Sequence, residues 1–311
     1  MKRIFVILIV LLLLADAASA QRRRRSARWK RTRYELCYGI GATNLLGELG
    51  GADQIGTDYV KDLEFAMSRP LGQIGLRYKI LENVAVKGAF TAGMLKGDDK
   101  TTLEYHRNNR NLHFRSMIYE FGLQLEYSII REKEGHRYRL RKVRGIKGYL
   151  TNTYFFAGIG GFYFNPKAKW DAVGGDGKWH ALQPIGTEGQ GMVPTRKKYS
   201  RLQVCIPVGF GFKYGLNRRW TVGLEYGLRK TFTDYIDDVS STYYDNDLLR
   251  QAKGDMAADL ADPSLSRQSE IYNMTGPNQQ RGDSKDKDAY MFLVLSFTYK
   301  MKTARNGMPK F

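Results

Sequence analysis

The side chains best suited to chemistry in this sequence are four histidines and two cysteines. The histidines, His106, His113, His136 and His180, are scattered along the chain. They lack the HExxH type of spacing, in which one helix face directs two imidazoles at a single metal ion. A Ser, His and carboxylate set with a common location cannot be assigned either. We therefore predict no catalytic residues, no metal site and no cofactor.

Two glycine-rich stretches superficially resemble nucleotide-binding loops. They are Gly158-Ile159-Gly160-Gly161 and Gly209-Phe210-Gly211. A phosphate-binding loop is followed directly by a helix, because the helix N-terminus holds the phosphate. Both stretches lie inside strand patterns with no helix after them. We interpret these glycines as small residues on the inner face of a sheet.

The elements that position these residues follow a period of two, the pattern of strands with two different faces. Eight segments show it: residues 34–41, 73–80, 84–94, 119–129, 154–164, 202–214, 220–229 and 291–299. Segment 119–129 is the clearest, whereas segment 154–164 carries aromatic residues in both registers, so its faces stay ambiguous. With 42% hydrophobic residues and a mean hydropathy of -0.46, the chain is too polar for a helical membrane protein.

Strands of about ten residues have the length that crosses a bilayer obliquely. A soluble barrel or sandwich would bury the apolar face, whereas a membrane barrel turns the same pattern inside out. Two features favour the membrane: connections alternate between short and long, and aromatic residues lie near strand ends (Tyr34, Tyr127, Tyr214, Trp220 and Tyr299). We predict an all-β fold, an eight-stranded antiparallel transmembrane β-barrel of the OmpA type with long outer loops.

The interior of an eight-stranded barrel is just wide enough for side chains to fill, so we expect no conduction. Charges in so narrow a space persist only when they are paired. We expect Arg77 and Lys87 to meet Glu120 or Glu126. The predicted lumen charge network is Arg77, Lys87, Glu120, Glu126, Glu225 and Arg229, with Glu35, Lys79 and Lys213 also facing inward.

Cys37 and Cys205 fall on the inward faces of the first and sixth strands. Three strand steps around the wall correspond to a chord of roughly 16 Å. A disulfide tolerates less than about 7 Å between Cα atoms. We therefore expect both cysteines to be free and to fill space in the lumen.

Residues 1–20 read as a secretory signal peptide. Lys2 and Arg3 form its charged start, residues 4–15 its apolar stretch, and Ala18-Ser19-Ala20 its small-residue cleavage site. A membrane anchor is the alternative, but twelve apolar residues fall short of the roughly 20 that a spanning helix needs. Gln21 in place of Cys gives no sign of a lipoprotein. We predict cleavage after Ala20, a basic periplasmic segment at 21–32, the barrel at 33–300 and a periplasmic tail at 301–311.

Positive charge is concentrated in the segments that an even strand number would place in the periplasm together with both termini. Residues 21–33, 131–147, 215–219 and 300–311 hold 22 basic and 2 acidic residues, whereas the rest of the mature chain holds 26 basic and 28 acidic. Export makes nucleic acid an unsuitable partner for this charge. A solvated tail, anionic outer-membrane lipid, a protein or peptidoglycan all remain open.

The connection 131–150 is long for a periplasmic turn, which favours a second anionic partner there. We predict that its partner-binding residues are Arg131, Arg137, Arg139, Arg141, Lys142 and Arg144.

Four stretches carry a resemblance to a known family. They are RYELCYGIGATNLLGELGG (33–51), RPLGQIGLRYKI (69–80), YFFAGIGGFYFNPKA (154–168) and DDVSSTYYD (237–245), the last containing Asp237, Asp238, Tyr243 and Tyr244. Together they resemble the PorG family, outer-membrane barrel components of the Bacteroidetes type IX secretion system. The resemblance covers roughly residues 33–300. It implies a non-catalytic role in association with a periplasmic ring of PorK and PorN type proteins, and it supplies no catalytic residues.

The leading hypothesis is therefore a type IX secretion component that connects periplasmic machinery to the outer membrane. A generic OmpA-like structural or adhesion barrel is the alternative. Eight-stranded outer-membrane enzymes that modify lipid A make an enzyme the remote alternative, but the sequence places no Ser/His/carboxylate set at a barrel rim.

Overall fold

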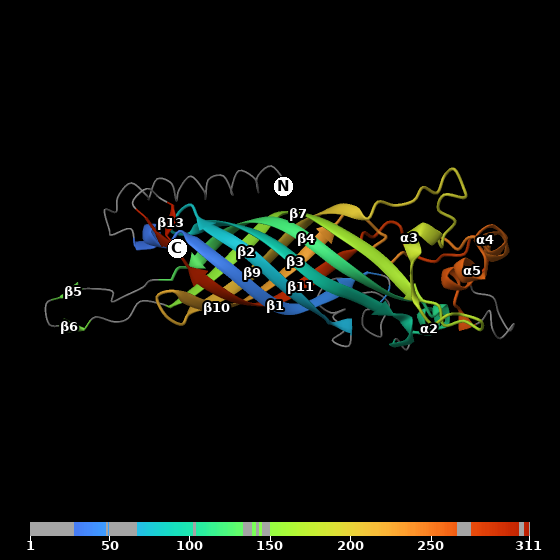
Figure 1. Ribbon diagram of the computed structural model, residues 1–311, viewed down its shortest axis with the longest axis horizontal. Coiled ribbons are helices and arrows are strands. Elements are labelled where there is room, and N and C mark those ends of the chain that lie inside the picture. The colour runs from blue at the N-terminus through green and yellow to red at the C-terminus, as the bar shows by residue number, and fades with distance from the viewer. Residues whose placement is uncertain are drawn as a thin grey trace, which may run out of the picture.

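The computed structural model describes residues 28–47, 49, 67–101, 104–132, 139–140, 143–144, 150–265, 275–304 and 308–310. Long strands run between the two ends of an elongated molecule (Figure 1). Eight of them form the barrel. They are β1 (Tyr34–Leu46), β2 (Arg69–Lys79), β3 (Val84–Asp98), β4 (His113–Ile130), β7 (Thr151–Lys169), β9 (Leu202–Gly215), β10 (Trp220–Thr231) and β11 (Ala289–Lys300).

The eight strands form a closed antiparallel barrel. Each pairs with its neighbours in the order β4-β3-β2-β1-β11-β10-β9-β7, and a further ladder between β4 and β7 closes the ring. The short strand β8 (Trp179–Ala181) adds to the end of β7. Closure pairs both edges of each of these eight strands. The predicted fold class is thereby confirmed. Among the described residues, no helix is long and apolar enough to cross a membrane.

The barrel is apolar outside and polar inside over most of its length. On β4, Phe121, Leu123 and Leu125 point outward with half or more of their surface exposed, whereas Glu120 and Glu126 between them are buried. A soluble barrel would show the reverse arrangement, because burial of apolar surface drives its folding. The exterior therefore has the character of a surface that contacts hydrocarbon.

Segment 154–164, whose faces the sequence leaves ambiguous, points Tyr154 and Phe156 inward. The two rings cover glycines on β9 and β10, the next two strands around the ring. A Cβ added at Gly209 would lie 2.5 Å from the Phe156 ring, and one at Gly227, its register partner, 2.8 Å from the same ring. A Cβ at Gly211 would collide with Tyr154. Large aromatic side chains on one strand thus fill the space that glycines leave on the next.

The two ends of the barrel differ in what they carry (Figure 1). One end, here called the basic end, holds the turns after β2 and β9 together with η2 (Arg28–Arg31), β5 (Arg139–Leu140), β6 (Val143–Arg144), β12 (Lys302–Thr303) and β13 (Pro309–Lys310). The opposite end is covered by the longer connections, here called the cap, with η5 (Asp99–Thr101), α2 (Tyr105–Arg110), β8, α3 (Leu182–Ile185), α4 (Asn246–Lys253) and α5 (Asp255–Ala261). The turns after β2 and β9 are short, but the connection after β4 (131–150) is longer than the cap connection between β3 and β4 (99–112), so the expected alternation of short and long connections holds only in part.

The cap has apolar cores of its own. At the cap end of the lumen, Phe114, Ile118 and Phe164 from the wall pack with Ile236 and Val239 from the connection after β10. A second core joins α3, α4 and α5 through Leu182, Ile185, Leu249, Ala257 and Leu260. Helix α4 begins after Asp245, whose carboxylate accepts hydrogen bonds from the backbone N–H groups of Asp247 and Leu248, both at 3.0 Å. The long connections are therefore folded onto the barrel.

Candidate functional site

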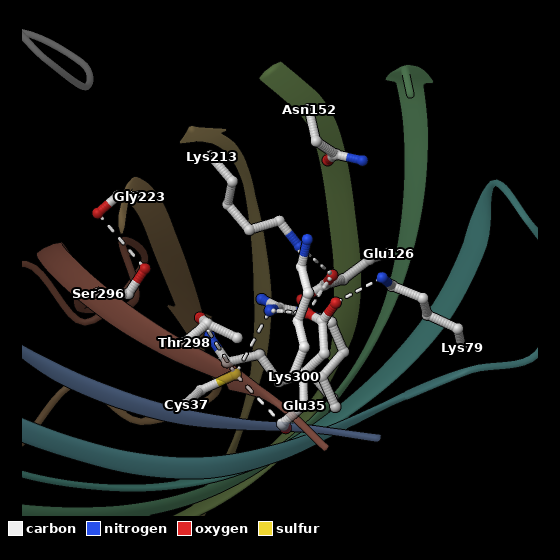
Figure 2. Close-up of polar contacts among 12 residues, drawn as sticks. Glu35, Cys37, Lys79, Glu126, Asn152, Lys213, Gly223, Ser296, Thr298 and Lys300 are labelled. Atoms are coloured by element: carbon white, nitrogen blue, oxygen red, sulfur yellow. Dashed lines mark hydrogen bonds and ion pairs between the residues drawn. The ribbon is translucent and has the colours of Figure 1, made fainter. Parts of the chain in front are cut away.

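The lumen near the basic end holds a connected set of buried charges (Figure 2). The Arg77 guanidinium lies between two carboxylates, with Nη1 3.0 Å from Glu35 Oε2 and Nε 2.7 Å from Glu126 Oε2. Lys79 Nζ lies 2.5 Å from Glu35 Oε1, and Lys213 Nζ is 3.9 Å from both carboxylates. Arg77 thus meets Glu126, one of its two expected partners. Buried charges tolerate this setting because each has an opposite charge close by.

The expectation for Lys87 is wrong. Lys87 does not pair with Glu120 or Glu126 on the adjacent strand, but reaches Glu225 on β10, with Nζ 2.9 and 2.8 Å from its two carboxylate oxygens. Tyr154 donates a further hydrogen bond to Glu225 Oε2 at 2.8 Å. Register places Lys87 opposite Gln124 on β4, so its neighbour on that strand is neutral. The ammonium therefore finds its partner across the lumen.

Glu120 is held by residues of the far wall. Arg229 Nε lies 3.4 Å from Glu120 Oε2, and the Tyr290 hydroxyl donates to the same oxygen at 2.7 Å. The same hydroxyl lies 3.5 Å from Cys205 Sγ. Cys205 on β9 and Cys37 on β1 are both buried and free. All six predicted network residues thus face the lumen, and every described charge among them is within 3.4 Å of an opposite one.

The packed interior decides what the barrel can do chemically. Layers of paired charges, aromatic rings and, at the cap end, an apolar core succeed one another along the lumen. Within the described part of the chain, no group of three or more His, Cys, Asp and Glu side chains is placed to hold a metal ion. The lumen therefore has the properties of a structural core.

A buried ion pair organises the cap, and the sequence analysis did not anticipate it. Glu188 and Arg281 are each about 1% exposed, with Arg281 Nη1 3.0 Å from Glu188 Oε1. Glu188 also accepts hydrogen bonds from the Ser240 and Ser241 backbone N–H groups at 2.9 and 3.2 Å. Arg281 Nη1 donates to the Asp238 carbonyl oxygen at 2.6 Å. The connection between β7 and β9 is thus joined to two distant parts of the connection between β10 and β11. Arg281 begins an Arg-Gly-Asp tripeptide, but its burial makes it part of the cap.

The family-like motif at Asp237, Asp238, Tyr243 and Tyr244 lies inside the cap. Asp237 accepts hydrogen bonds from the backbone of Leu49 at 3.1 Å and of Val239 at 3.0 Å. Tyr243 is 3% exposed, and Tyr244 packs against the core of α3, α4 and α5. The motif therefore holds the connection after β10 in place and offers little surface to an external ligand.

Two carboxyl groups of this motif region sit in an environment that disfavours their charge. Burial raises the pKa of Asp238 to about 6, although Arg281 and the hydroxyls of Thr187 and Tyr199 oppose the rise. The Tyr199 hydroxyl donates to Asp238 Oδ1 at 2.6 Å and the Thr187 hydroxyl to Oδ2 at 2.5 Å. Burial likewise raises the pKa of Asp234 to about 7. Because these pKa values differ from that of a solvated aspartate, the stability of the cap should depend on pH.

At the basic end, the two ends of the described chain meet. The Arg33 backbone N–H donates to Thr303 Oγ1 at 3.4 Å, and the Met301 N–H donates to the Tyr34 carbonyl oxygen at 2.9 Å. The Arg33 guanidinium lies over the Trp29 ring at 5.0 Å. Helix η2 and the β12–β13 hairpin therefore form one small basic surface beside the barrel mouth.

The predicted partner-binding residues of the long connection fall largely outside the described residues. Arg137, Arg141 and Lys142 lie outside them, and of Arg139 and Arg144 only the pairing of their backbones, as register partners of β5 and β6, is described. Arg131 is described and half-buried, with Nη1 3.5 Å from Glu82 Oε2. Glu132 turns the other way, and Lys300 Nζ lies 2.5 Å from its Oε1 at the floor of the lumen. One of the two acids of the connection is therefore used inside the barrel.

Comparison with known proteins gives structural matches only. No family model matches the chain, and no curated protein matches it. Among solved structures, the chain is similar to Neisserial surface protein A, with a TM-score of 0.39, 8% identity, and coverage of 86% of this chain and 96% of that one. It is also similar to Ail of Yersinia pestis, with a TM-score of 0.37, 8% identity, and coverage of 86% and 98%. OprG of Pseudomonas aeruginosa matches with a TM-score of 0.35, 10% identity, and coverage of 87% and 96%. These likenesses concern the fold alone.

Proposed function

We propose that the chain is an outer-membrane β-barrel that connects periplasmic protein machinery to the membrane through its basic end. The resemblance to the PorG family makes the ring of type IX secretion, of PorK and PorN type, the proposed partner. The protein has no catalytic role in this proposal. The apolar exterior supports the membrane location, because an exposed surface of that kind is stable only against hydrocarbon.

The carrying observation is the separation of charge between the two ends of a filled barrel. The mouth at the basic end combines η2, the β12–β13 hairpin and the connection that contains β5 and β6 (Figure 1). Its nearby acids Glu35 and Glu132 are paired with lysines inside the barrel. Among the described residues of this end, Arg131 has an acid nearby at the surface, Glu82 at 3.5 Å. The other basic residues of the connection are the proposed contacts for an acidic partner. With the cap outside the cell, this end faces the periplasm.

The experiment is a crosslinked pull-down from outer membranes, with the bound proteins identified by mass spectrometry. The wild type is compared with a variant in which Arg131, Arg137, Arg139, Arg141, Lys142 and Arg144 are all replaced by Gln. We expect the variant to release its periplasmic partner, and higher salt to weaken the wild-type complex, since surface charges are screened within about 8 Å at physiological salt. The variant should still fractionate with outer membranes and show heat-modifiable gel mobility, because these residues lie outside the strands of the barrel.

The control removes charge from the cap by replacing Asp247, Asp255 and Asp283, which are exposed, with Asn. Docking should survive these changes. Retention of the partner by the basic-end variant, together with its loss from the cap variant, would overturn both the orientation and the docking proposal. Recovery of the wild type as a soluble periplasmic protein would overturn the membrane location.

A further inference from the structure

Three cations form a row on the outer wall of the barrel near the cap. Lys96 on β3 is the register partner of Arg115 on β4, and Arg115 is the register partner of Lys167 on β7. All three are half-buried and alternate with residues that face the lumen. Their side chains therefore leave the barrel on the same side and at the same height. Lys96, Arg115 and Lys167 are called the cation row below.

Like charges directly opposite one another on neighbouring strands destabilise a sheet. Protein groups compensate the cation row only in part. Asp98 Oδ2 lies 3.5 Å from Lys96 Nζ, and the Arg115 guanidinium lies 3.9 Å from the centre of the Trp179 ring. Within the described chain, neither Arg115 nor Lys167 forms an ion pair. Trp179 therefore orients the Arg115 guanidinium, and the described carboxylates neutralise only part of the positive charge of the row.

A groove begins directly below the row. It has a volume of about 410 Å³ and is lined by Met94, Arg115, Met117, Tyr119, Tyr163, Asn165 and Lys167. Along β4, Arg115 comes first from the cap end, and the exposed Met117 and Tyr119 follow at steps of two residues. Tyr119 and Tyr163 are register partners, so two phenol rings cross the lower part of the groove.

The order along the wall is therefore cationic, then methionine-lined, then aromatic, then fully apolar. That order matches an amphiphile with an anionic head and acyl chains, standing parallel to the barrel axis. Arginine and lysine bind phosphate through charge-assisted hydrogen bonds, and tyrosines are typical of the depth where headgroups meet hydrocarbon. The flexible methionines provide a surface that acyl chains can pack against.

We propose that this groove binds a phosphorylated acylated lipid of the outer leaflet, with the chemistry of lipid A. The phosphate lies on Arg115 and Lys167, with Lys96 at its edge, and an acyl chain follows Met94 and Met117 past the tyrosines. The inference rests on the membrane location and orientation proposed above. It does not depend on docking at the basic end.

The test measures binding of lipid A to the purified full-length protein in detergent, by native mass spectrometry across a lipid titration. A triple variant carries Lys96→Gln, Arg115→Gln and Lys167→Gln. We expect it to bind lipid A at least about tenfold more weakly than the wild type, because it can no longer donate charge-assisted hydrogen bonds to the phosphate. Binding within about twofold of the wild type would overturn the proposal.

The matched control replaces Lys178, Lys197 and Lys285, three exposed lysines of the cap, with Gln. It removes the same charge from the same end and should bind lipid A as the wild type does. Equal weakening of both variants would mean that only the overall charge matters, which would overturn the site. Heat-modifiable mobility of each variant verifies that the barrel is closed. The single change Arg115→Gln keeps the test decisive where the triple variant does not fold, since it should weaken binding on its own.

Two further ligands identify the source of the phosphate. Lipid A stripped of its phosphates should bind at least about tenfold more weakly to the wild type, and inorganic phosphate should compete poorly because it lacks the acyl chains. Tight binding of the stripped lipid, or inorganic phosphate that competes as well as lipid A, would overturn the assignment. Failure of the periplasmic pull-down would leave these results unaffected, whereas a protein without heat-modifiable mobility would contradict the membrane location itself.

Discussion

Lys87 and Glu225 form an ion pair between opposite walls of the barrel, with Nζ 2.9 and 2.8 Å from the two carboxylate oxygens. Their strands, β3 and β10, are four strand steps apart in either direction around the ring. Backbone ladders connect only neighbouring strands, so this contact fixes the cross-section of the barrel in a way that the ladders do not. Both side chains are at most 2% exposed.

Replacing one partner of this pair should lower the free energy of unfolding much more than replacing both. Lys87→Met leaves Glu225 as a buried unpaired carboxylate, so we expect a loss of about 3–5 kcal/mol in the free energy of unfolding. Lys87→Met combined with Glu225→Gln should recover most of that loss, because no uncompensated charge remains and Tyr154 keeps an acceptor. Urea-induced unfolding in lipid vesicles, followed by tryptophan fluorescence, measures both.

An exposed pair supplies the control for this prediction. Lys169 Nζ lies 2.8 Å from Asp171 Oδ1, with side chains 41% and 50% exposed. Lys169→Gln should change the free energy of unfolding by at most about 1 kcal/mol. A double variant at Lys87 and Glu225 that is as unstable as the single variant would contradict this prediction. It would mean that the ion pair itself stabilises the barrel, and that the unpaired carboxylate is not the cause of the loss.

The sequence predicts the barrel well because alternation is a local signal. A two-residue period on β2, β4, β9 and β10 states directly which side chains share a face. Which charges meet across the lumen is a different matter, because it depends on strand order, register and the width of the closed ring. Arg77 could be paired by proximity along the chain, but Lys87 could not. Glu225 is close to Lys87 only after all eight strands have closed.

The cap end of the barrel departs from the expected alternation for a physical reason. In this region Leu95, Phe114 and Phe164 point inward on the ends of β3, β4 and β7 and are fully buried. They pack against the connection after β10, so their partners come from a distant segment. The ion pair of Glu188 and Arg281 could not be predicted from the sequence for the same reason. Neither residue lies in a periodic element, and their 93-residue separation gives no local signal.

Glycines opposite aromatic rings should tolerate no larger side chain. Gly209→Leu would place atoms where the Phe156 ring lies, and overpacking of a filled interior typically costs about 1–3 kcal/mol or more. We expect the variant to show reduced heat-modifiable gel mobility. Gly161 is the control: contrary to the inner-face position expected from the sequence, it faces outward and has no atom within 4 Å of an added Cβ. Gly161→Leu should leave folding intact, and equal damage from both changes would contradict the packing argument.

The filled lumen predicts a barrel that does not conduct. Charge pairs, aromatic rings and the apolar core at the cap end fill the space that larger barrels leave open as a continuous water path. Protein reconstituted in planar bilayers should give no steady current under an applied voltage. A stable channel of large conductance would contradict the packing of the interior.

The cap should loosen as the pH rises toward neutrality. Burial raises the pKa of Asp234 to about 7, and Lys287 and the Ser240 hydroxyl oppose that rise only in part, while Asp237 and Glu188 reinforce it. In an opened cap, the pKa of the same carboxyl returns to about 3.9. Between these values the closed cap retains a proton that the opened cap releases, so opening becomes more favourable as pH increases. Below about 4 and above about 7, both states hold the same charge and the dependence ends.

Asp238, with its pKa raised to about 6, adds to this dependence in the lower part of the window. Hydrogen exchange of the cap amides, measured from pH 5 to pH 8 and corrected for intrinsic exchange, reports the opening equilibrium. One proton accounts for at most about a tenfold change per pH unit. Asp234→Asn removes one titrating group, so it should lower the slope from pH 5 to pH 7 and leave the profile nearly flat above about pH 6.5, where Asp238 is already ionised in both states. Barrel amides on β1 and β2 should keep wild-type exchange. A cap that opens more readily at pH 5 than at pH 7.5 would reverse the sign of the linkage, and it would mean that Asp234 and Asp238 are ionised and stabilised in the closed cap.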